Sequence, residues 1–70
     1  MERFAINSEN LQAIQYNGVD HTLEVEFKNG GTYQYFDVPR RVVLGLLSAS
    51  SKGRYFNDRI RRRFAAFRTL

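Results

Sequence analysis

The stretch that decides the fold runs from residue 22 to residue 36 and reads TLEVEFKNGGTYQYF. In its first half, Leu23, Val25 and Phe27 fall on one face, and the residues between them are polar or charged. Alternation with a period of two and one apolar face is typical of a half-buried antiparallel strand. The NGG sequence at residues 29–31 then predicts a hairpin turn, so that the second half of the stretch returns beside the first.

The length of the hairpin loop decides where Tyr33 and Tyr35 point, because a slip of one residue reverses the faces of a strand. A two-residue loop at residues 29–30 would place both rings on the polar face. A three-residue loop at residues 28–30, with Gly30 in a left-handed conformation, would place both on the apolar face. We favour the three-residue loop, since it joins two large rings to the apolar face and leaves smaller polar residues outside.

Outside this stretch, the sequence predicts one further strand and two helices. The three expected strands are residues 11–16, 22–28 and 32–36, and a turn at residues 17–20 separates the first two. Seventy residues make one domain. We therefore expect an α+β fold, a small three-stranded antiparallel meander followed by two short helices packed on one face.

Pro39 opens the first helix, because proline suits a first helical turn, and Asp37 or Val38 is the expected cap. The apolar stripe of this helix consists of Val42, Val43, Leu46 and Leu47. Leu44 lies off the stripe and is expected to be exposed. Gly45 should weaken the helix by about 1 kcal/mol relative to alanine.

Either Ser50 or Ser51 caps the second helix. Phe56 and Ile60 align on its apolar side, and Tyr55 lies at the edge of that side, where its ring can pack inward while its hydroxyl reaches solvent.

The regular part of the second helix is expected to end near Arg61, because Arg63 would otherwise fall inside the apolar stripe. Phe64 and Phe67 would then fold back as irregular or short helical structure.

Positive charge is concentrated at the C-terminal end of the chain. The net charge is +4; residues 1–51 carry four basic and six acidic side chains, whereas residues 52–70 carry seven basic and one acidic. Such asymmetry predicts an anionic partner, nucleic acid first and an acidic protein surface second.

Residue types that hold metals or act as nucleophiles are scarce. The chain has no cysteine and one histidine, His21, so we expect no disulfide, metal or other cofactor. Glu24 and Glu26 share the polar face of one strand, and a solvated strand face explains them better than an acid–base pair does. We expect no enzymatic activity.

The N-terminus lacks the apolar stretch of a signal peptide, and no apolar run approaches the roughly 20 residues that span a bilayer. The sequence therefore predicts a soluble, cytoplasmic protein with no membrane partner.

Several segments resemble the KTSC domain family. SKG at residues 51–53, YFN at residues 55–57 and IR at residues 60–61 resemble its C-terminal signature, and YQY at residues 33–35 resembles its central motif. Residues 23–30 and the VP pair at residues 38–39 fit as well. The resemblance covers about residues 8–64 and implies a single KTSC-like domain with terminal extensions at residues 1–7 and 65–70.

The KTSC family is named for the C-terminal extension of some lysyl-tRNA synthetases, and it also occurs as a stand-alone domain in bacterial and phage proteins. The synthetase association implies RNA binding. The RRRFAAF sequence at residues 61–67 makes this tail more basic than the signature requires, which favours nucleic acid further.

The candidate nucleic-acid-binding residues are six basic and three aromatic side chains: Lys52, Arg54, Arg59, Arg61, Arg62, Arg63, Tyr33, Tyr35 and Tyr55. The basic groups would contact phosphates and the tyrosines would stack on bases. The alternative for the basic groups is a solvated helix face, on which Asp58 pairs with the arginines four residues away on either side. The alternative for Tyr33 and Tyr35 is a place in the core.

Two polar features have structural and functional interpretations. Residues 51–53 would either bind an anion at the start of a helix or simply cap it, and we favour the cap. Asn57 is expected to hydrogen-bond backbone groups between the helix and a loop.

The competing function is a protein–protein interaction module or small homo-oligomer. Sheet edges that could pair and an exposed Leu44 motivate it. The sequence is compatible with a monomer or a weak homodimer.

Overall fold

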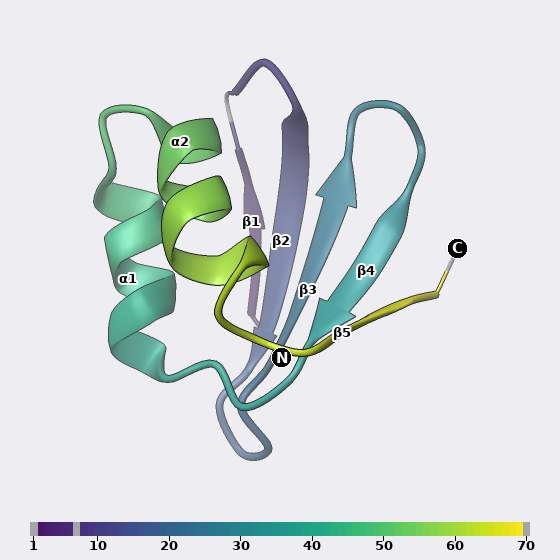
Figure 1. Ribbon diagram of the computed structural model, residues 1–70, viewed down its shortest axis with the longest axis vertical. Helices are drawn as coiled ribbons and strands as arrows, with labels where there is room; N and C mark the ends of the chain where they lie inside the picture. Colours follow the sequence, from purple (N-terminus) through teal and green to yellow (C-terminus); the bar gives the residue numbers. More distant parts are fainter. Residues whose placement is uncertain (1, 7, 70) are drawn as a thin grey trace.

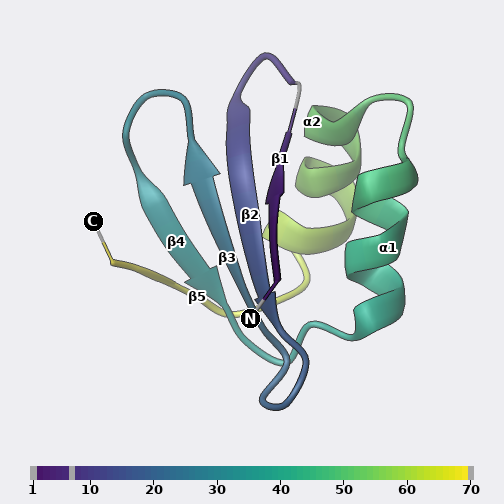
Figure 2. The same ribbon diagram turned by 180° about the vertical axis from the view of Figure 1, so that it is seen from behind.

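A five-stranded antiparallel sheet carries two helices on one of its faces (Figure 1 and Figure 2). The computed structural model describes residues 2–6 and 8–69. The strands are β1 (Glu2–Ala5), β2 (Leu11–Asn17), β3 (Thr22–Phe27), β4 (Thr32–Tyr35) and β5 (Ala66–Arg68), in that order across the sheet. Between β4 and β5 lie helix α1 (Arg40–Ser48), helix α2 (Lys52–Phe56) and the π-helical segment η1 (Asn57–Arg61).

The α+β class and the placement of both helices on one face are confirmed, but the prediction of a three-stranded sheet is wrong. Strands β1 and β5 lie within the ends that were expected to be extensions, and they form the two edges of the sheet. All three residues of β5 are exposed, so burial does not alternate along it. A strand of this kind is specified by hydrogen bonds to its neighbour and not by its own pattern.

The three-residue hairpin loop is confirmed. Val25 lies opposite Tyr33 and Leu23 lies opposite Tyr35, which is the register that puts both rings on the apolar face. Gly30 has a φ of 98°, the left-handed conformation that the bulged loop requires. Its backbone N–H donates to the Phe27 carbonyl at 3.0 Å.

The core lies between the sheet and the helices. Its sheet side includes Ile14, Tyr16, Leu23, Val25 and Tyr35, and its helix side includes Val43, Leu46, Phe56 and Ile60. The stripe predicted for α1 faces this core, with Val42 and Leu47 partly buried at its border. Leu44 is 54% exposed, as expected.

The other face of the sheet is polar. The Arg3 guanidinium donates to the Glu26 carboxylate, and this hydrogen bond lowers the pKa of Glu26. Gln34 donates to Glu24 at 3.4 Å. Both carboxylates thus have neighbours across the strands, as an alternating strand face requires.

Val38 anchors the chain where it turns from the sheet into α1. Its backbone N–H donates to the His21 carbonyl at 2.9 Å, and its own carbonyl accepts from the Tyr16 hydroxyl at 2.6 Å. The expectation that Asp37 or Val38 caps α1 is wrong: Pro39 is the cap residue, because it stays extended with ψ 151° and the helix begins one residue later.

Replacing Tyr16 with phenylalanine should therefore lower the free energy of unfolding by about 1–3 kcal/mol, because a fully buried carbonyl would lose its donor. Urea unfolding followed by circular dichroism measures the change. Tyr33→Phe is the matched control, since its hydroxyl has no hydrogen-bond partner among the described residues, and it should change stability by less than about 0.5 kcal/mol. Equal effects of the two substitutions would contradict the anchoring role of Tyr16.

Helix α2 begins and η1 ends where the sequence predicts. The Ser51 side chain accepts from the Arg54 backbone N–H, and η1 ends at Arg61. Two details differ. The Tyr55 hydroxyl does not point to solvent but donates to the Val42 carbonyl at 2.9 Å, and Phe67 lies in β5 instead of irregular or short helical structure.

Candidate nucleic-acid interface

The helices leave the β3–β4 hairpin uncovered (Figure 1). A groove lies beside this hairpin on the helix-bearing side of the sheet. Its volume is about 720 Å³, within the roughly 300–1,000 Å³ of small-ligand pockets. Its lining comes from residues 9–11, the hairpin at residues 27–35, the α2–η1 segment at residues 53–61, and Arg68 of β5.

Four rings line this aromatic groove together with the apolar side chain of Leu11: Phe27, Tyr33, Tyr35 and Phe56. The hairpin register places the first three on one face of the sheet, and α2 supplies the fourth. Each ring contacts two others, with centroid distances of 5.7 Å, 6.5 Å, 5.5 Å and 5.5 Å around the cycle. Three of the four pairs meet edge to face, a favoured arrangement that fixes the rings.

Guanidinium groups stand at the rim of the aromatic groove. The Arg68 guanidinium carbon lies 5.7 Å from the centre of the Tyr33 ring, within the range of a cation–π contact. Arg61 Nη1 donates to Asn57 Oδ1 at 3.5 Å. Burial raises the pKa of Tyr35, whereas the positive charge of Arg61 acts to lower it. The net shift is upward, so the Tyr35 phenol stays protonated through neutral pH.

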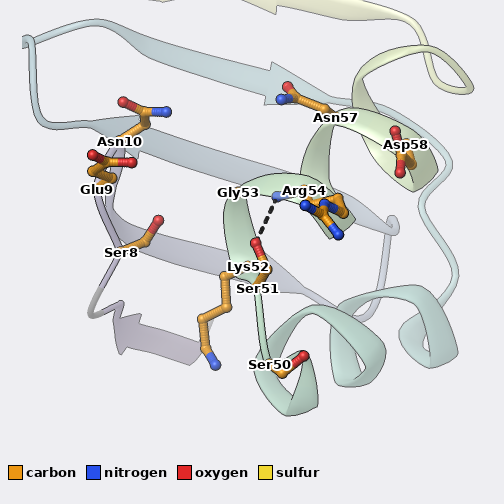
Figure 3. Close-up of a pocket in the computed structure, with 10 residues that line it drawn as sticks. All are labelled: Ser8, Glu9, Asn10, Ser50, Ser51, Lys52, Gly53, Arg54, Asn57 and Asp58. Atoms are coloured by element: carbon orange, nitrogen blue, oxygen red, sulfur yellow. Dashed lines mark hydrogen bonds between the residues drawn. The ribbon is translucent and has the colours of Figure 1, made fainter.

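A second hollow of about 500 Å³ adjoins the aromatic groove at the start of α2 (Figure 3). Loop residues 8–10 form one wall and the first turn of α2 forms the other. Two cations, Lys52 and Arg54, line it together with two carboxylates, Glu9 and Asp58, so its charges balance. The two hollows share four lining residues, Glu9, Asn10, Gly53 and Asn57, and form one continuous surface.

Five of the nine candidate residues line this surface. Tyr33, Tyr35 and Arg61 line the aromatic groove, and Lys52 and Arg54 line the second hollow. The Lys52 ammonium donates to the Ala49 carbonyl at 2.9 Å, and the cap predicted for Ser51 is present in the same turn.

The other four candidates lie elsewhere on the helical segment. Tyr55 packs toward α1, and the Arg59 guanidinium lies 6.0 Å from the centre of its ring. Arg62 and Arg63 are exposed at the end of η1, where Arg63 Nε donates to the Asp58 carbonyl at 3.3 Å.

The pairing of Asp58 with Arg54 and Arg62, given above as the alternative for the basic groups, is absent from the described residues. In the described part of the chain, the ion pairs join Arg3 to Glu26 and Arg40 to Glu2. The side chain of Asn57 accepts from Arg61 instead of bridging to backbone groups.

Sequence reasoning missed several residues of the groove, among them Phe27 and Phe56 in its wall and the cations Lys28 and Arg68. Phe27 was assigned to the core, and it is only half-buried. Arg68 lies beyond the segment covered by the family resemblance, and only the pairing of β5 with β4 places it opposite Tyr33.

Residues 2–6 and 8–69 lack two other kinds of feature. These residues contain no cluster of three or more histidine, cysteine, aspartate or glutamate side chains that could hold a metal ion. Their helices lack the length and apolar character that a membrane-spanning helix requires.

Comparison with known proteins gives relatives over most of the chain. An uncharacterized protein of Stutzerimonas stutzeri is 46% identical over 58 residues, which cover 83% of this chain and 82% of that protein. A lysine–tRNA ligase of a Nostoc species is 41% identical over 54 residues, which cover 77% of this chain but 10% of the ligase.

Solved structures and family comparison agree with these relatives. The crystal structure of a KTSC domain protein from Yersinia pestis is similar with a TM-score of 0.93 and 35% sequence identity, over 99% of this chain and 97% of that one. The KTSC domain family matches residues 7–64 of this sequence. The resemblance in the sequence motifs is thereby confirmed, and the chain belongs to the KTSC domain family.

Proposed function

We propose that this protein is a non-enzymatic module that binds nucleic acid, RNA foremost, through the α2–η1 segment and the aromatic groove beside it. The observation that carries the proposal is that aromatic and cationic side chains lie together along one continuous surface. Among the described residues, five cationic side chains and two carboxylates line the groove and the adjoining hollow: Lys28, Lys52, Arg54, Arg61 and Arg68, against Glu9 and Asp58. Aromatic rings beside a positively charged track are the usual means of binding single-stranded nucleic acid.

The relatives add support for RNA. The lysine–tRNA ligases of Nostoc and Trichormus species contain a matching segment of 54 residues, and their names refer to tRNA. A segment that occupies 10% of such a protein is the size of an accessory domain.

A non-enzymatic role agrees with the contacts of the two carboxylates on β3, Glu24 and Glu26. Glu26 accepts from Arg3 and Glu24 accepts from Gln34, so both contribute to the polar face of the sheet. They lie on the face opposite to the groove, because the register puts Val25 and Tyr33 on the helix side.

The proposal predicts salt-dependent binding of RNA. Fluorescence anisotropy with tRNA, single-stranded RNA and duplex DNA should give an affinity whose logarithm falls with the logarithm of salt concentration, with a slope near −3 if about three or four phosphates are engaged. Absence of binding to all three at about 50 mM salt, or a flat salt response, would refute the proposal.

A matched pair of charge reversals locates the surface. Arg62→Glu and Arg41→Glu change the net charge equally, and both side chains are exposed, the first at the end of η1 and the second on α1. Arg62→Glu should weaken RNA binding by about tenfold, whereas Arg41→Glu should weaken it by less than about threefold, because distant charges are screened over roughly 10 Å. Equal losses of RNA affinity would indicate that RNA is attracted by the net charge of the protein and that no defined surface binds it.

A second candidate function is self-association or binding of another protein through the β5 edge. Phe67 is 63% exposed on this three-residue edge strand, and a large exposed ring beside unpaired backbone groups is typical of a pairing edge. Sedimentation at high salt distinguishes this candidate, because an association through apolar and backbone contacts would persist where phosphate contacts weaken. A strict monomer would exclude self-association through this edge.

A further inference from the structure

We propose that the aromatic groove holds one unstacked nucleotide, with its base against Phe27 and Tyr33 and its phosphate at Arg61 and the Tyr35 hydroxyl. This inference deepens the proposed function and rests on it for the macromolecular source of the nucleotide. It assigns different tasks to two parts of the surface, recognition of one nucleotide in the groove and contact with neighbouring phosphates along α2 and η1.

The first support is the state of the Tyr35 hydroxyl. The residue is only 4% exposed, and its hydroxyl has no hydrogen-bond partner among the described residues. No side-chain polar atom in the described part of the chain is both fully buried and without a partner, so this hydroxyl keeps some accessible surface, and the groove is the hollow that Tyr35 lines. A buried side chain that aims an unused donor into a cavity is suited to a ligand with acceptor oxygens.

The second support is that Arg61 lines the same groove as Tyr35. Its positive charge acts on the ionisation of Tyr35, and both residues line the groove. Asn57 Oδ1 accepts from Arg61 Nη1, which orients the guanidinium. A guanidinium and a protonated phenol that line one groove supply several donors, and phosphate oxygens are the acceptors that such a set recognises best.

The third support is the apolar wall. Phe27 and Tyr33 are half-buried, so part of each ring faces the groove, and their edge-to-face contact at 5.7 Å holds them at 88° to each other. A flat heteroaromatic ring can stack on one of them while its edge meets the other. Arg68, which lies over Tyr33, adds a second cation on the side of the base.

The balance of charge separates the groove from the adjoining hollow. Among the described residues that line the groove, three are cations, Lys28, Arg61 and Arg68, and one is a carboxylate, Glu9. The hollow at the start of α2 has two of each sign and lies at a helix of five residues. The groove therefore favours an anion that carries a flat ring, and its volume of about 720 Å³ accommodates one nucleotide and not a folded strand.

The test compares a free nucleotide with the same nucleotide in a short strand. Uridine and adenosine 5′-monophosphates, uridine, inorganic phosphate and a five-nucleotide single-stranded RNA are titrated into the protein, and amide chemical shifts are followed by NMR. Both mononucleotides are expected to shift the amides of residues 27–35 and 56–61, with millimolar affinity, and to bind at least about tenfold more tightly than uridine or inorganic phosphate alone.

Two substitutions in the groove and two outside it complete the design. Tyr35→Phe removes only the unused hydroxyl and should leave the melting temperature unchanged while weakening mononucleotide binding about threefold to tenfold. Arg61→Gln should weaken it by about tenfold or more. Arg54→Gln and Arg62→Gln remove the same charge elsewhere, and they should weaken the binding of the strand but not that of the mononucleotide.

The outcomes separate this inference from the proposed function. If the strand binds with the expected salt dependence but Tyr35→Phe and Arg61→Gln leave mononucleotide binding unchanged, as Arg54→Gln and Arg62→Gln do, the protein binds nucleic acid and the groove inference is wrong. If mononucleotides bind through Tyr35 and Arg61 but no strand binds, the groove takes a free nucleotide and the proposed function is wrong. If inorganic phosphate binds as tightly as the nucleotides, the role given to the aromatic wall is overturned, and no binding of any probe overturns both proposals.

Discussion

Replacing Phe56 with alanine is expected to lower the free energy of unfolding by about 3–5 kcal/mol. The ring is 2% exposed and lies 5.5 Å, centroid to centroid, from both Phe27 and Tyr35. Alanine would leave a cavity between α2 and the sheet and would break the cycle of four rings. A domain of 70 residues has only about 4–10 kcal/mol in total, so the variant should be close to unfolded near room temperature.

Urea unfolding of the purified variants measures this loss. Phe67→Ala is the matched control, because it removes the same ring from a position that is 63% exposed, and it should cost less than about 0.5–1 kcal/mol. Phe56→Leu, which keeps most of the buried volume, should cost about 1–1.5 kcal/mol. If Phe56→Ala and Phe67→Ala had similar effects, the packing of α2 on the sheet would not be a main source of stability.

Gly45→Ala should destabilise the protein by about 1–3 kcal/mol, although helix propensity alone predicts a gain of about 1 kcal/mol. A Cβ atom at this position would lie 2.7 Å from Tyr55 Cζ and 3.0 Å from Tyr55 Cε2, and closer still to the hydroxyl oxygen. The ring would have to move, and its hydrogen bond to the Val42 carbonyl would break. For a domain of this size the melting temperature should fall by roughly 4–8 °C per kcal/mol.

A double-mutant cycle isolates this contact. Leucine at position 55 lacks the ring and hydroxyl that the new methyl group would meet. In the Tyr55→Leu background, Gly45→Ala should therefore be neutral or stabilising, so that the two substitutions couple by about 1–3 kcal/mol. A stabilising effect of Gly45→Ala in the wild-type protein would show that the α1–α2 contact is loose enough to admit a methyl group.

Local patterns predicted the centre of the fold well. The alternation of residues 22–28 and the left-handed Gly30 define the hairpin and its register, because both depend on neighbours within a few positions. The stripe of α1, the Ser51 cap and the end of the helical segment at Arg61 are likewise local in origin. The cap of α1 was predicted one or two residues before its actual position at Pro39. Val38 accepts from the Tyr16 hydroxyl and donates to the His21 carbonyl, and these contacts between distant segments hold it outside the helix.

The candidate site was predicted only in part. Aromatic and basic residue types indicated a nucleic-acid interface, and Tyr33, Tyr35 and Arg61 do lie in one groove. Tyr55 was included because it lies at the edge of the apolar side of the helix, where its hydroxyl could reach solvent, but this hydroxyl donates to the Val42 carbonyl of α1. Arg68 was omitted, since a three-residue strand without alternating burial has no local signature.

The hairpin, the two amphipathic helical segments and the excess of positive charge at the C-terminal end all follow from the amino-acid sequence, because each depends on residues close together in the chain. Tertiary structure alone decided that both ends of the chain become edge strands, that Gly45 makes room for Tyr55, and that residues 27–35, 56–61 and 68 surround one groove. Those features arise from contacts between distant segments, whose energies come from pairing and packing and leave no periodic pattern in any one of them.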